Sequence, residues 1–65
     1  MKVLVNDEEL DVEASTTVAA LVAWLGFPDK GIAVAVDWTV IPKSAWDTAI
    51  SDGARIEVVT AVQGG

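Results

Sequence analysis

The sequence has 65 residues, enough for one small domain with a single core and too few for a second. It contains neither Cys nor His, which excludes disulfides and the usual thiolate or imidazole metal ligands, so stability must come from the 52% of residues that are hydrophobic. The formal net charge of −6 argues against a nucleic-acid partner, and leaves open whether the acidity steers the protein toward basic surfaces of other proteins or only maintains solubility.

The N-terminal segment holds one Lys and a very short apolar run before acidic residues begin, which is unlike a signal peptide. No apolar run approaches the roughly 18 residues of a membrane-spanning helix. We therefore expect a cytoplasmic protein with no membrane partner, in agreement with the lack of Cys.

A β-hairpin is predicted at the start of the chain. Apolar and polar residues alternate over 2–6 and 10–13, and the segment 6–9 between them is polar and turn-forming. The alternation directs four apolar side chains to one face: Val3, Val5, Leu10 and Val12. The consecutive acids at 7–9 lack the spaced oxygen ligands of a calcium loop, so a solvated turn is favoured and no metal site is expected.

A short helix is predicted next. The apolar residues that recur at helical spacing are Val18, Leu21, Val22 and Leu25. Thr17 is the predicted N-cap, and Gly26, followed by Pro28, is the predicted C-terminal stop. The apolar stripe should pack on a sheet, and Trp24 at its flank should pack at the edge of the core.

Two strands should follow the helix. The apolar run 31–36 has the length of a strand, and 40–41 is a short strand closed by Pro42. The segment 37–39 between them is a predicted turn, which makes exposure of Trp38 plausible on sequence grounds.

The last and longest strand is predicted over 55–62, after a turn at 52–53. The segment 43–47 should be irregular or a single helical turn, with Trp46 wedged against the rim of the core. Because the first and last strands are both apolar, we predict that they pair in parallel inside the sheet. The resulting fold class is α+β: a β-grasp (ubiquitin-like) domain over 1–62, with a mixed sheet of four to five strands and one main helix on one face.

The sequence offers no His, Cys or Tyr to act as a base or nucleophile, so we do not expect an enzyme. The remaining candidate is the predicted flexible tail 63–65, whose glycines have no side chain to pack and could enter a narrow cleft of a partner. The α-carboxylate of Gly65, with Gly64 before it, is ionised at neutral pH because its reference pKa is roughly 3.3 to 3.7. It could therefore attack an activated phosphate without a general base.

Three apolar residues, Leu4, Val59 and Ala61, have the opposite parity to the core-facing positions of their strands. They should be exposed on the sheet face away from the helix, as a docking surface or as scattered surface hydrophobes. Trp38 is a further candidate for partner contact, and Gln63 should enter the partner with the tail.

Five segments carry a resemblance over essentially the whole chain: Val3-Leu4-Val5-Asn6-Asp7, Thr17-Val18 leading to Leu21, Ile41-Pro42-Lys43-Ser44-Ala45-Trp46, Asp52-Gly53, and Gly64-Gly65. In their order and spacing they are similar to the thiamine-biosynthesis sulfur carriers of the ThiS family. None of the segments is specific alone, but their combination in so short a chain is.

The resemblance implies a protein co-substrate that binds no cofactor itself and is monomeric when free. An E1-like adenylyltransferase of the ThiF type would use ATP and Mg to convert the Gly65 carboxylate to an acyl-adenylate. A persulfide sulfur donor would displace AMP, and the resulting thiocarboxylate would deliver sulfur to a thiazole synthase of the ThiG type.

Two alternatives stay open at this point. A sulfur carrier for molybdopterin shares the fold, the Gly-Gly end and the adenylation chemistry, although such chains are usually longer. In a non-covalent ubiquitin-like interaction module, the two glycines would be incidental.

Overall fold

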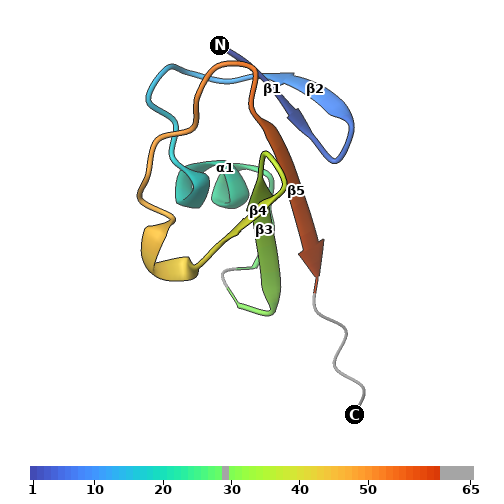
Figure 1. The fold of residues 1–65 in the computed structure, drawn as a ribbon, viewed down its shortest axis with the longest axis vertical. Helices are drawn as coiled ribbons and strands as arrows, with labels where there is room; N and C mark the ends of the chain where they lie inside the picture. The colour runs from blue at the N-terminus through green and yellow to red at the C-terminus, as the bar shows by residue number, and fades with distance from the viewer. Residues whose placement is uncertain (29, 61–65) are drawn as a thin grey trace.

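A mixed sheet and a helix packed on one of its faces form the two layers of the molecule (Figure 1). The computed structural model describes residues 1–28 and 30–60, in which the α-helix is α1 (Val18–Trp24). The five strands are β1 (Lys2–Val5), β2 (Glu8–Asp11), β3 (Ile32–Val36), β4 (Thr39–Ile41) and β5 (Arg55–Thr60). The strand order is β2-β1-β5-β3-β4, which confirms the predicted α+β, β-grasp architecture.

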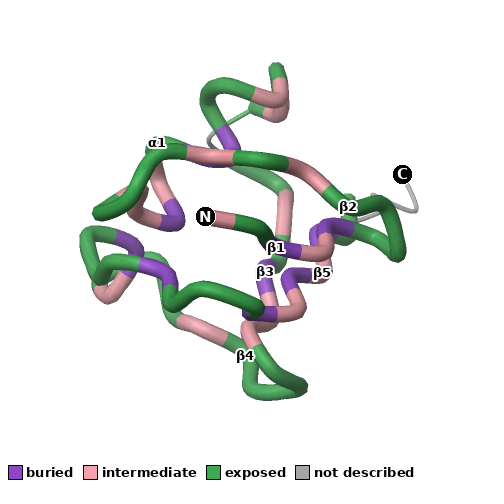
Figure 2. The backbone as a smooth tube through the Cα atoms, turned by 90° about the horizontal axis from the view of Figure 1, so that it is seen from above, coloured by how far each residue is buried: buried purple, intermediate pink, exposed green. Residues whose placement is uncertain are grey.

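The centre of the sheet is the parallel pair of β1 and β5, as the apolar character of both strands predicts. Val5 lies opposite Ile56 in the register, and β5 runs antiparallel to β3 on its other side. Buried stretches of β1, β3 and β5 therefore lie side by side in the interior (Figure 2). Of the predicted last strand 55–62, residues 61 and 62 lie outside the described residues.

The turn between β1 and β2 is shorter than predicted. Asn6 and Asp7 form a two-residue turn with φ values of 50° and 69°, so β2 begins at Glu8, two residues before the predicted strand 10–13. Asn and Asp tolerate this left-handed conformation, and such turns match the twist of the flanking strands. Val12 consequently lies beyond the strand, half-buried against the core.

The turn between β3 and β4 has the same form. Asp37 and Trp38 have φ values of 50° and 73°, and Thr39 already belongs to β4. After β4, Lys43–Ala45 form one turn of 3-10 helix (η1), which confirms the predicted single turn over 43–47.

Helix α1 begins and ends where its sequence signals predict. The Thr17 hydroxyl accepts a hydrogen bond from the backbone N–H of Ala20 at 3.1 Å, so Thr17 is the N-cap. Gly26 follows the helix with a φ of 85°, a conformation that favours glycine. The predicted edge packing of Trp24 is wrong, because its side chain is 67% exposed. It lies on the helix flank beside an open groove that the segment 11–16 also lines.

The core lies between α1 and the sheet and is entirely apolar in the described residues. Its members are Val3, Val5, Val18, Leu21, Val22, Val34, Trp46, Ile50, Ala54, Ile56 and Val58. Trp46 is buried as predicted, and its indole Nε1 donates to the carbonyl oxygen of Ile41 at 3.1 Å. Packing of these side chains is the main stabilising term for a domain of this size.

Candidate functional site

The predicted reactive end of the chain follows strand β5. Gly65, Gly64, Gln63 and Ala61 lie outside the described residues, so the tail predicted over 63–65 stays a prediction. The structure describes the strand that precedes them. β5 pairs with β1 only at Arg55 and Ile56, whereas its pairing with β3 continues to Thr60. Its second half therefore extends past the β1–β2 hairpin (Figure 1).

The sheet face away from α1 carries exposed apolar side chains near this end of β5. Val59 is 61% exposed, as its parity predicts, and lies opposite Ala33 of β3 in the register. Val40 of β4 is also exposed and lies opposite Ala35. These four residues, Ala33, Ala35, Val40 and Val59, are called the outer apolar patch below.

Leu4 differs from this prediction because it is half-buried rather than substantially exposed. Its position in the register is between Glu9 of β2 and Arg55 of β5, so strands with long side chains flank it on both sides. Val59 has the small side chain of Ala33 on one side and no β1 residue opposite on the other. Parity gave the face of both residues correctly, but the neighbouring strands decide how much of each side chain is covered.

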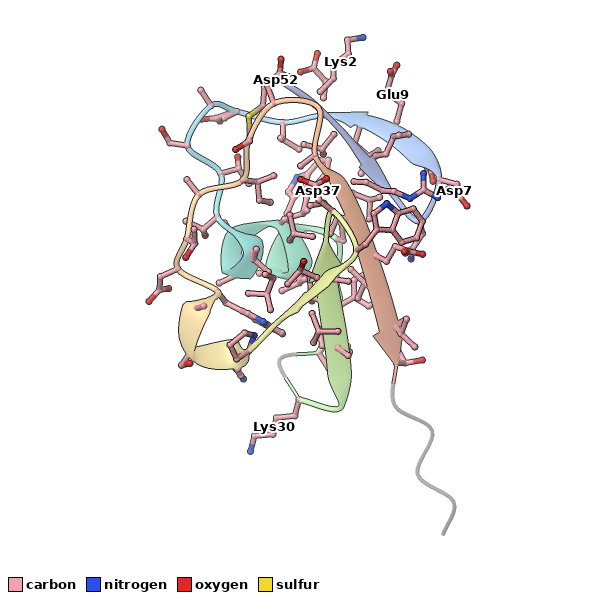
Figure 3. All side chains as sticks on the ribbon, viewed as in Figure 1. Lys2, Asp7, Glu9, Lys30, Asp37 and Asp52 are labelled. Atoms are coloured by element: carbon pink, nitrogen blue, oxygen red, sulfur yellow. The ribbon has the colours of Figure 1, made fainter. Side chains whose placement is uncertain are left out.

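Trp38 is 72% exposed at the tip of the β3–β4 hairpin, which confirms the predicted exposure. The Arg55 guanidinium lies 4.6 Å from the centroid of its indole ring, in cation–π geometry. Arg55 also donates from Nη2 to Oδ1 of Asp7 at 2.6 Å, at the tip of the other hairpin (Figure 3). The ion pair and the ring contact join the two hairpin tips across β5 and hold Trp38 beside the sheet.

Asp7 is thus paired with a cation of its own chain. Within residues 1–28 and 30–60, no three Asp, Glu, His or Cys side chains lie together as a possible metal site. In the same ranges, no helix is long and apolar enough to cross a membrane. The described residues supply an exposed apolar face beside β5, which ends at Thr60.

Comparison with known proteins agrees with this arrangement over the full length of the chain. A family model described as the ThiS family matches residues 1–65. The crystal structure of a thiamine biosynthesis protein (ThiS) from Geobacter metallireducens is similar with a TM-score of 0.85 and 26% identity, and the match covers 100% of both chains. A solution structure of a thiamine biosynthesis protein from the same organism gives a TM-score of 0.78 and 25% identity over 100% of this chain and 88% of that one.

A thiazole synthase from Paramagnetospirillum magneticum is 38% identical to this chain over 66 residues. The match covers 100% of this chain and 20% of that protein, so the chain spans about a fifth of the length of this curated relative.

Proposed function

The chain belongs to the ThiS family, and from this premise we propose that it is the protein sulfur carrier of thiamine biosynthesis. An E1-like adenylyltransferase of the ThiF type, using ATP and Mg, adenylates the carboxylate of Gly65. The terminal sulfur of a persulfide donor then attacks the activated carbonyl and displaces AMP, which gives an acyl disulfide. A thiol reductant cleaves the S–S bond of this intermediate and releases the C-terminal thiocarboxylate. The observation that carries this proposal is the family match to residues 1–65, because it includes both terminal glycines.

A ThiG-type thiazole synthase is the proposed acceptor of the sulfur. The support for this acceptor is that a protein named thiazole synthase contains a segment similar to the whole of this chain. The proposed compartment is the cytoplasm, because adenylation consumes ATP and the chain has no Cys that would need an oxidising environment.

The thiocarboxylate is the product that tests the proposal. Intact mass spectrometry after incubation with the activating enzyme, ATP, a persulfide donor and a thiol reductant should show the mass gain of one oxygen replaced by sulfur. Omission of ATP is the control, because without adenylation the carboxylate has no leaving group. If the complete reaction left the mass unchanged, the non-covalent interaction module would become the better reading. Transfer of the sulfur to a molybdopterin precursor, and not to the thiazole, would favour the other alternative.

The outer apolar patch, together with Trp38, is the proposed docking surface for the activating enzyme. The exposed valine side chains flank small alanines and form an apolar face, bordered on β5 by the charged Glu57, that an apolar surface of a partner can cover. Because Val59 directly precedes Thr60, the last described residue of β5, an enzyme that holds this face also holds the chain just before the terminal segment.

We expect Val59→Asp to raise the KM for adenylation about tenfold or more, because the charge must be desolvated when the patch is covered. The fold should persist, since the side chain is 61% exposed. Ala20→Asp is the matched control, because it adds the same charge at an exposed position of α1 on the other side of the sheet. Steady-state kinetics and circular dichroism separate the effects: unfolding of Val59→Asp, or an equal rise in KM for both variants, would contradict a docking role.

A further inference from the structure

Among the described residues, no strand pairs with the second half of β5 on the side that faces β1. Backbone groups of even-numbered residues face β1: the Leu4 N–H donates to the carbonyl oxygen of Ala54, just before β5, and the Asn6 N–H donates to that of Ile56, both at 2.9 Å. At Asn6 the chain turns away into the β1–β2 hairpin with a φ of 50°. The backbone of β1 therefore cannot continue the ladder to Val58.

The side chain of Asn6 continues the ladder instead. Its Oδ1 accepts a hydrogen bond from the backbone N–H of Val58 at 2.9 Å, and its Nδ2 donates to the carbonyl oxygen of Val58 at 3.2 Å. A carboxamide has the same donor and acceptor pair as a peptide group, so it satisfies both backbone groups of one residue. The Asn6 side chain thus takes the place that a β1 backbone residue would occupy opposite Val58.

This contact lies two residues before the described end of β5. Beyond it, the described partner of the strand is β3, through the pair Ile32 and Thr60. A strand that is hydrogen-bonded to a neighbour on one edge only can rotate about that edge. Hydrogen bonds along both edges fix its direction. The Asn6 amide is therefore the last described contact on the β1 side that fixes the direction of β5 near its described end.

We infer that Asn6 is a positioning residue for the carrier reaction, because it fixes the direction in which β5 presents the terminal segment to the activating enzyme. The inference rests on the proposed function. The Gly65 carboxylate has to meet the phosphate of ATP within about 0.5 Å of productive geometry, so loss of a fixed exit direction lowers the fraction of bound chains that react. The outer apolar patch is unchanged by this loss, and the affinity for the enzyme should be largely retained.

The fold contains a matched control at the opposite end of the same strand. Asp37 also occupies the first position of a two-residue turn, also with a φ of 50°, and its Oδ1 accepts a hydrogen bond from the backbone N–H of Arg55 at 2.9 Å. Asn6→Gly and Asp37→Gly both remove a side-chain bond to β5 at a turn position that glycine adopts readily. They differ in which end of β5 is released.

The test measures adenylation kinetics and amide hydrogen exchange for the native chain and both variants. Asn6→Gly should lower kcat for ATP–pyrophosphate exchange about tenfold while KM for the carrier stays within about twofold. Asp37→Gly should leave both constants within about twofold. Exchange of the Val58 amide should accelerate more than that of Val59 in Asn6→Gly, because only the former loses its acceptor.

An equal fall in kcat for the two variants would overturn the inference, because it would show a general effect of destabilisation. A rise in KM without a fall in kcat would assign Asn6 to docking and would also overturn it. Unchanged exchange of the Val58 amide in Asn6→Gly would refute the anchoring contact itself, and this result does not depend on activity. Failure of the native chain to be adenylated would instead refute the proposed function.

Discussion

Removal of Gly65 should abolish adenylation and leave the fold intact. The core residues all lie between Val3 and Val58, so the deletion removes no side chain that packs in the core. It moves the reacting carboxylate inward by one residue, roughly 3.5 Å, whereas productive alignment tolerates about 0.5 Å. ATP–pyrophosphate exchange with the purified activating enzyme should therefore fall to background, while the thermal unfolding midpoint stays unchanged.

Gly64→Ala provides the graded comparison for this deletion. It keeps the length of the chain and should slow exchange without abolishing it, because the added methyl restricts backbone freedom beside the reacting carboxylate. Undiminished exchange by the chain that lacks Gly65 would refute the terminal-carboxylate mechanism. It would leave the non-covalent interaction module as the better account of the protein.

Leu21→Ala should remove about half of the free energy of unfolding of the domain. Leu21 is 1% exposed in the core between α1 and the sheet, and its truncation should cost about 2–5 kcal/mol. A domain of this length has a free energy of unfolding of about 3–10 kcal/mol in total, so the variant should lose about half of it and unfold at a much lower urea concentration. Urea unfolding followed by circular dichroism gives the difference directly.

Trp24→Ala is the control for this prediction, since it removes a larger side chain three residues further along the same helix. Trp24 is 67% exposed, so the substitution should cost about 1 kcal/mol or less. A loss as large as that of Leu21→Ala would show that the indole packs on the domain in solution. The loss of stability would then follow the size of the removed side chain and not its burial, which is 1% exposure for Leu21 and 67% for Trp24.

The sequence was sufficient for features whose causes are local or periodic. The hydroxyl of Thr17, the apolar stripe that contains Leu21 and the glycine at position 26 predict α1 because each acts within one or two helical turns. The parallel pairing of β1 and β5 was also predictable, since strands rich in Val, Ile and Leu favour the interior of a sheet. The Gly65 carboxylate emerged as the candidate reactive group because the chain has no His, Cys or Tyr to act as a base or nucleophile.

Tertiary structure alone decided the features that depend on which strands become neighbours. Leu4 and Val59 both point to the sheet face away from α1. The register places long side chains on the strands beside Leu4 but not beside Val59, so only Val59 is mostly exposed. Asn6 looked like an ordinary turn residue, and its bonds to Val58 arise because β5 lies beside a hairpin 52 positions earlier in the sequence. Periodicity specifies the face to which a side chain points, whereas coverage and hydrogen-bond partners are set by residues that folding brings together from distant positions.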